Sequence, residues 1–135
     1  MTERLIFSVA LILFGFAAWT LYNRLSLHRL KHTAPIDPLL ADLKAGRPAI
    51  LYFTTPTCIP CRTVQKPALI KLQAELGAGI QVIEIDSLEQ PEVADRWGVF
   101  SAPTTFILDR DHRPQKVNRG VASAETLKKQ LQAFA

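Results

Sequence analysis

The sequence predicts an α/β domain with a central mixed sheet of about four strands flanked by helices, preceded by one N-terminal transmembrane helix. Three observations predict this fold class. The chain opens on an uncharged apolar run. Short apolar runs rich in β-forming residues then alternate with segments of helical spacing, in the order βαβα followed by ββα. Finally, 135 residues leave room for one ordinary domain and a short appendage.

The N-terminal apolar run covers residues 5–22 and carries no charge. As a helix it would be roughly 27 Å long, close to the hydrocarbon thickness of a bilayer. Trp19 and Tyr22 stand at its end, where aromatic rings favour the lipid–water boundary. We therefore predict a short tail at 1–4, a transmembrane helix at 5–22 that contacts the lipid bilayer, and a basic flank and linker at 23–35.

A cleavable signal peptide is the alternative interpretation of this run, since a short basic start and small residues such as Gly15 and Ala17 loosely fit that pattern. The run continues past them to Tyr22, which favours a retained anchor and a single-pass membrane protein. Lys and Arg are denser after the helix than before it. The positive-inside rule therefore favours the cytoplasmic face for the domain.

Charge outside the membrane flank is nearly balanced. Residues 1–33 hold four basic side chains and one acidic one, whereas the other 102 residues hold 12 basic and 11 acidic side chains. The net positive charge thus belongs to the flank rather than to a basic binding face, and no nucleic acid partner is expected.

The domain predicted for residues 36–135 begins with a short helix and a strand. The leucines of residues 39–46 suit a short helix that ends at a glycine. Residues 49–54, AILYFT, form a short apolar run rich in β-formers, which is typical of a buried strand.

A longer helix follows. Apolar residues that include Val64 recur at helical spacing over residues 60–76, and Pro67 should kink this helix. Residues 81–86 predict a second, largely buried strand, and residues 91–97 a short helix.

The last part of the chain predicts two strands and a helix. Residues 104–108 and 115–119 read as strands joined by a turn at 109–114, which is rich in turn-forming residues. A final helix begins near Ser123 and places its leucines on one apolar stripe.

The two cysteines, Cys58 and Cys61, stand directly after a predicted strand and at the start of the long predicted helix. A helix N-terminus presents free N–H groups and a partial positive charge, which lower the pKa of a cysteine placed there. This position predicts Cys58 as the nucleophile and Cys61 as the resolving thiol that releases a mixed disulfide. Ile59 and Pro60 shape the active site between them, and Pro60 fits the first helical turn.

On the segments FTTPTCIPCRTVQKP and IEIDSLEQPEVADRWGVFSAPTTFILDRD, the sequence resembles the thioredoxin family over roughly residues 36–135. The resemblance implies a thioredoxin-like fold. It also implies a thiol-disulfide oxidoreductase whose redox group is a Cys58–Cys61 disulfide, with no other cofactor and no metal. Asp86 matches the aspartate that ends the second strand in that family.

The resemblance further implies where a substrate binds. The family's proline with a cis peptide bond maps onto Pro103, which would put Ala102 and Pro103 beside Cys58. The backbone of Ala102 would then pair with an extended substrate segment. Thr57 replaces the family's usual tryptophan and is expected on the same substrate-binding surface. The expected partners are protein disulfides and an electron donor that the sequence does not identify.

One departure from the family concerns proton transfer. The buried aspartate that the family carries six residues before the first cysteine is Tyr52 here. That carboxylate is thought to help deprotonate the resolving thiol. We therefore expect slower release of mixed disulfides near neutral pH.

The resemblance also bears on redox direction and location. Strongly oxidising relatives place a histidine between the cysteines, where this chain has Ile59 and Pro60, and this difference favours a reductant. A single N-terminal anchor before such a domain resembles family members that face outward. The extracytoplasmic face is thus the alternative to the cytoplasmic one.

Two other functions compete with this interpretation. His28 and His32 are four residues apart and, with Cys58 and Cys61, would complete a tetrahedral zinc site. The histidines lie in the membrane flank, which argues against that site. A non-catalytic thioredoxin-like module that binds a partner at the membrane is the other alternative, although a structural disulfide would be expected to close a longer loop.

Overall fold

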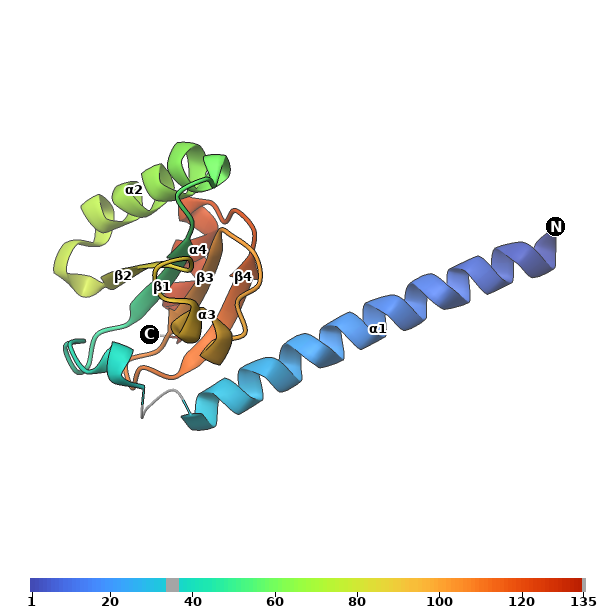
Figure 1. Cartoon of the computed structure of the whole chain (residues 1–135), viewed down its shortest axis with the longest axis horizontal. Coiled ribbons are helices and arrows are strands. Elements are labelled where there is room, and N and C mark those ends of the chain that lie inside the picture. The colour runs from blue at the N-terminus through green and yellow to red at the C-terminus, as the bar shows by residue number, and fades with distance from the viewer. Residues whose placement is uncertain (34–36, 135) are drawn as a thin grey trace.

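Four strands form one mixed sheet in the order β2-β1-β3-β4, and helices cover both of its faces (Figure 1). This computed structural model describes residues 1–33 and 37–134. Strand β1 pairs parallel to β2 and antiparallel to β3, and β3 pairs antiparallel to β4, as the predicted mixed sheet requires. The strands are β1 (Ala49–Thr54), β2 (Gln81–Asp86), β3 (Thr104–Leu108) and β4 (Pro114–Arg119).

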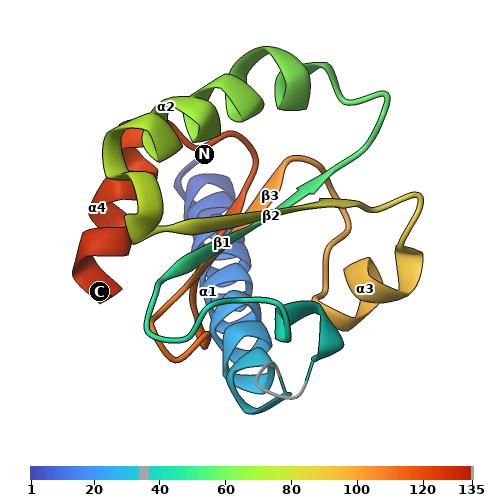
Figure 2. The ribbon, with the colours of Figure 1, turned by 90° about the vertical axis from the view of Figure 1, so that its left-hand side faces the viewer.

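The side chains of β1 alternate between the two faces of the sheet. Leu51 and Phe53 belong to the core cluster that includes residues of α3, and Ile50 and Tyr52 to the cluster that includes residues of α2 and α4. Figure 2 shows α3 on one side of the sheet and α2 and α4 on the other. Because β1 is a central strand, it is buried on both faces and reads as a continuous apolar run. The helices are α2 (Lys66–Leu76), α3 (Pro91–Arg96) and α4 (Ala124–Phe134).

The helix predicted for residues 60–76 is divided into two parts. A π-helical turn, η3 (Cys61–Gln65), precedes α2, and Pro67 stands in the first turn of α2, where its missing N–H is tolerated. The wider turn carries Gln65 into the core and leaves Val64 50% exposed. The prediction that Val64 belongs to the buried stripe is therefore wrong.

The helix predicted for residues 39–46 is reduced to one 3-10 turn, η2 (Pro38–Leu40). The backbone of Lys44 instead forms two hydrogen bonds with the side chain of Gln81. Its N–H donates to Gln81 Oε1 at 2.6 Å, and its carbonyl accepts from Gln81 Nε2 at 2.9 Å. This contact across 37 residues replaces the helical hydrogen bonds. A second 3-10 turn, η4 (Gly77–Gly79), follows α2.

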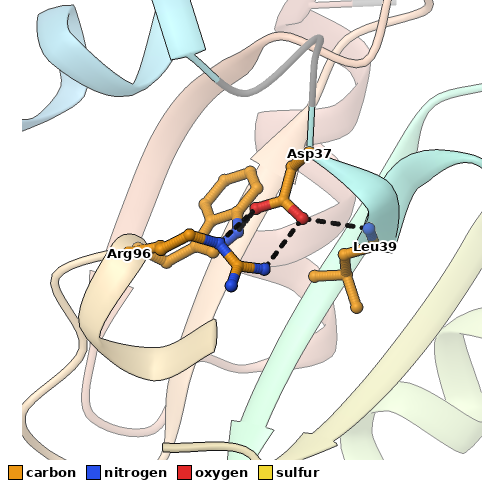
Figure 3. A network of polar contacts seen from close by, with 4 residues as sticks. Asp37, Leu39 and Arg96 are labelled. Carbon is orange, nitrogen blue, oxygen red and sulfur yellow. Dashed lines mark hydrogen bonds and ion pairs between the residues drawn. The ribbon is translucent and has the colours of Figure 1, made fainter. Parts of the chain in front are cut away.

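A cluster of polar contacts around Asp37 joins the start of the domain to α3 (Figure 3). The carboxylate accepts hydrogen bonds from the Leu39 N–H at 2.9 Å, from Arg96 Nε and Nη2 at 3.2 and 3.1 Å, and from Trp97 Nε1 at 3.0 Å. Burial by itself raises the pKa of Asp37, but the bonds from Arg96, Leu39 and Trp97 together hold it below its ordinary value. The cluster thus favours the ionised carboxylate.

The N-terminal helix is longer than the predicted span. Helix α1 (Thr2–Thr33) includes most of the residues predicted as a tail and as a basic flank, and it projects far from the sheet (Figure 1). Its Thr2–His32 stretch is long and apolar enough to cross a membrane. Leu30 near its end is buried in the core beside Trp97, and this packing explains why the helix continues. Residues 34–36, which include the linker and the predicted start of the domain, lie outside the described residues.

Candidate functional site

The two cysteines form a disulfide at the point where β1 leads into η3. The S–S distance is 2.03 Å, and the Cα atoms are 5.3 Å apart. The Cys61 N–H donates to Cys58 Sγ at 3.2 Å, so the backbone at the helix start faces the first sulfur. Cys58 is partly exposed, whereas Cys61 is fully buried. Of the two cysteines, Cys58 is therefore the one that solvent can reach.

Tyr52 lies directly beneath the buried cysteine. Its hydroxyl donates to the carbonyl oxygen of Cys61 at 3.1 Å, and its side chain is 2% exposed. Burial raises the pKa of Tyr52 above its ordinary value of 10.0, so the phenol stays neutral at physiological pH. Tyr52 fixes the backbone of Cys61 but offers no carboxylate that could accept its proton.

A cleft of ≈ 610 Å³ opens beside Cys58. The predicted site residues that line it are Thr57, Cys58, Ile59, Pro60 and Ala102. Two predicted site residues, Cys61 and Pro103, are buried and lie outside its lining.

The loop before β3 forms one wall of this cleft. The Ala102–Pro103 peptide bond is cis, as the resemblance implies. Ala102 borders the cleft, and the Pro103 carbonyl accepts from the Gly120 N–H at 2.8 Å. The Ser87 hydroxyl oxygen also belongs to a lining residue, is buried and has no hydrogen-bond partner among the described residues. A peptide bound in the cleft can supply that partner.

Three exposed apolar side chains line the cleft, and two of them, Leu88 and Phe100, were not predicted as site residues. Ile59 is 62%, Leu88 66% and Phe100 64% exposed, and all three line the cleft. The guanidinium of Arg119 lies 4.6 Å from the centroid of the Phe100 ring, which holds that ring at the cleft wall. Single exposed apolar residues are common, so their sequence positions carried no signal.

Gln65 is a further residue that the sequence did not reveal. Its side chain is fully buried and pairs with the backbone of Ala122: Nε2 donates to the carbonyl at 3.1 Å and Oε1 accepts from the N–H at 2.9 Å. This pair ties the turn that carries Cys61 to the loop after β4. Gln65 is thus a positioning residue for the cysteine pair.

No metal site forms around the cysteines in the part of the chain that the structure describes. His28 and His32 lie on α1 with their ring centroids 4.9 Å apart. Among residues 1–33 and 37–134, no group of three or more His, Cys, Asp or Glu side chains is placed to hold a metal ion. The geometry therefore gives no support to the zinc alternative.

Comparison with known proteins identifies the family. The Thioredoxin family model matches residues 39–133. A thioredoxin-like protein of Synechocystis is 32% identical over 96 residues, which cover 70% of this chain and 90% of that protein. Thioredoxin 1 of Synechococcus elongatus is 30% identical over 66% of this chain and 85% of its own. Thioredoxin M4 of Arabidopsis chloroplasts is 28% identical, and the match spans 47% of its length.

Solved structures share the fold. Thioredoxin-2 of a malaria parasite superposes with a TM-score of 0.61 at 24% identity, over 64% of this chain and 82% of that chain. StoA of Bacillus subtilis superposes with a TM-score of 0.54 at 18% identity, over 64% and 84%. The chain belongs to the thioredoxin family, and its Cys58–Cys61 pair supports thiol-disulfide oxidoreductase activity.

Proposed function

We propose that this protein is a membrane-tethered reductant of protein disulfides, with Cys58 as the nucleophile and Cys61 as the resolving thiol. One observation carries the assignment of roles: Cys58 is partly exposed and lines the cleft, whereas Cys61 is fully buried. The redox group is the cysteine pair itself, and the proposal needs no other cofactor.

The reaction begins with the reduced protein. The Cys58 thiolate attacks one sulfur of the substrate disulfide, whose S–S bond breaks, and the departing sulfur takes up a proton. Cys61 then loses its proton and attacks Cys58 Sγ, which breaks the mixed disulfide and releases the second substrate thiol. Two electrons have passed to the substrate. A dithiol donor must then reduce Cys58–Cys61 again.

The tether in this proposal is the apolar part of α1. It is long enough to cross a bilayer, and its most apolar stretch is not buried against the domain. Arg24, Arg29 and Lys31 follow it and favour the cytoplasmic face. A cysteine introduced at exposed Asp111 tests the side: a membrane-impermeant maleimide should label it only after intact cells are opened. Labelling in intact cells would assign the domain to the outer face.

Catalysis is tested with the full chain in detergent micelles, by reduction of insulin with dithiothreitol as the donor. We expect turnover with the wild type and none with Cys58→Ser. Cys61→Ser should accumulate a mixed disulfide on Cys58 that gel analysis resolves, because nothing displaces the substrate. An inert wild-type disulfide would instead support the non-catalytic binding module.

Cys58→Ser with Cys61 intact is the matched control for trapping. If Cys58→Ser trapped substrate and Cys61→Ser did not, the assignment of nucleophile and resolving thiol would be reversed.

A further inference from the structure

The C-terminal third of α1 packs against the domain instead of leading to it as a free tether. Leu30 is 7% exposed and belongs to the core cluster, with Leu27 packed beside it. The Ser26 hydroxyl lies 3.7 Å from the place that a Cβ on Gly98 would occupy. Burial of these leucines removes apolar surface from water, so this seam between α1 and the domain stabilises one orientation.

The seam lies close to the catalytic cleft. Gly98, the residue beside the Ser26 hydroxyl, accepts through its carbonyl a hydrogen bond from Arg119 Nη1 at 3.1 Å. Arg119 in turn lies over the ring of Phe100, which lines the cleft beside Cys58. A short series of neighbouring residues therefore connects α1 at Ser26 to the cleft.

The level of Ser26 along α1 fixes how far the cleft stands from the predicted bilayer. The apolar run ends at Tyr22, four residues before Ser26. At 1.5 Å per residue these four residues span about 6 Å of helix axis. If α1 crosses the bilayer perpendicular to its plane, the contacts that lead to the cleft thus begin about one helical turn from the membrane boundary.

A second cavity, of ≈ 650 Å³, lies between α1 and the domain even closer to that boundary. Trp19 and Asn23 line it from α1, and Val64, Arg119 and Val121 line it from the domain. Asn23 Oδ1 and Arg119 Nε are buried there and have no hydrogen-bond partner among the described residues. Val64 and Val121 are 50% and 45% exposed. This mixture of polar and apolar groups suits the headgroup region of a bilayer.

We propose that α1 holds the catalytic cleft at the bilayer surface, and that the substrates are disulfides in membrane-bound proteins, placed within a few residues of their membrane spans. The inference rests on the proposed function, which supplies the membrane span and the attack by Cys58. The apolar residues around the cleft, Ile59 and Phe100, then face substrate segments that emerge from the same bilayer. A disulfide far from the membrane lies out of reach of a cleft held in this way.

The orientation is tested without any activity. A nitroxide is attached at Val121→Cys in full-length Cys58→Ser/Cys61→Ser protein, reconstituted in phosphatidylcholine–phosphatidylglycerol vesicles. Its collisions with oxygen, which concentrates in lipid, are compared with those of a water-soluble nickel complex. The matched control is Asp111→Cys in the β3–β4 turn, at the other end of the sheet. We expect a higher oxygen-to-nickel ratio at residue 121 than at 111, and equal ratios would overturn the orientation.

Substrate choice is tested with the active full chain in the same vesicles. Two model substrates share one transmembrane helix and carry the same disulfide loop, either three residues from the span or after a rigid helical spacer of about 30 residues, roughly 45 Å. We expect the near disulfide to be reduced about tenfold faster, because the anchor presents the cleft at that level. Equal rates would overturn the substrate class.

An uncoupled variant shows whether the seam causes this preference. Four Gly and Ser residues are inserted between Arg24 and Leu25. The insertion leaves the membrane span and the domain intact, but the span no longer fixes the orientation of the domain. We expect its rates on the two substrates to become equal, while insulin reduction in micelles stays at the wild-type rate. A retained preference would contradict the role of the seam, and a failure of insulin reduction by the wild type would contradict the proposed function instead.

Discussion

Two buried polar side chains, Asp37 and Tyr52, are held in different ways. The Asp37 carboxylate accepts four hydrogen bonds, two of them from the Arg96 guanidinium, and these bonds favour its charge. The Tyr52 hydroxyl is neutral and donates a hydrogen bond to the backbone carbonyl of Cys61. A charged cluster therefore stabilises the start of the domain, whereas the backbone of the cysteine pair is held by Tyr52, an uncharged side chain that has no carboxylate to accept a proton.

The largest effect is expected from Asp37→Asn. The variant weakens charge-assisted bonds to Arg96, Leu39 and Trp97, and should lower the free energy of unfolding by about 2 kcal/mol. Turnover at 25 °C should not change, because Asp37 does not line the cleft. Urea unfolding and insulin reduction measure the two effects. Asp42→Asn, at an exposed position, is the control, and an equal loss there would contradict a specific role for the cluster.

The same cluster predicts a pH dependence. The pKa of Asp37 is lower in the folded protein than in the unfolded chain, where it is near 3.8. The contribution of Asp37 to the free energy of unfolding is therefore fully present above the unfolded pKa, and it is lost as pH falls through the lower folded pKa. The stability difference between wild type and Asp37→Asn should be constant from pH 5 to 7, by the same linkage, and should shrink below about pH 4. Urea unfolding at a series of pH values measures it. A constant difference down to pH 2 would exclude this linkage.

Next in size is the effect of placing a carboxylate under Cys61. Tyr52→Asp introduces a buried base, and should accelerate release of the mixed disulfide near neutral pH by about tenfold. Stopped-flow decay of a preformed mixed disulfide across pH 6–9 measures it. Tyr52→Phe is the shape-matched control and should show no such acceleration. An unchanged pH–rate profile in Tyr52→Asp would show that the missing carboxylate does not limit resolution.

The smallest effect is expected at the ion pair near Tyr52. Lys66 Nζ and Glu84 Oε2 are 3.5 Å apart, but both side chains are about half exposed. Lys66→Gln should lower the free energy of unfolding by at most about 0.5 kcal/mol, and even this difference should fade in high salt. Chemical unfolding at low and high salt measures it. A loss as large as that of Asp37→Asn would break the contrast between a buried charged cluster and a solvated pair.

Most of the sheet and the cysteine pair could be predicted from the sequence because they depend on short-range patterns. The run of residues 49–54 is apolar throughout because β1 is central, and such a run is recognised locally. Cys58 and Cys61 are three residues apart at a helix start, so their pairing needs no distant partner. The cis bond before Pro103 could be expected only through the family resemblance, and the structure contains it.

Spacing alone predicted the wrong buried residue in the helix after Cys58. A regular helix places Val64 on the apolar stripe, but the π-helical turn rotates Gln65 inward instead. Gln65 is accepted in the core because the Ala122 backbone, 57 residues away, satisfies its amide. No pattern within one segment encodes that partner.

The sequence by itself determined the four strands, most of the helices, the position of the two cysteines and the start of an apolar span, since propensity, periodicity and charge act over a few residues. Only the tertiary structure decided that Gln65 is buried, that Asp37 joins Arg96 and Trp97, and that α1 packs on the domain through Leu30. These outcomes depend on contacts between residues far apart in the chain. Such contacts exist only once the sheet has brought those residues together.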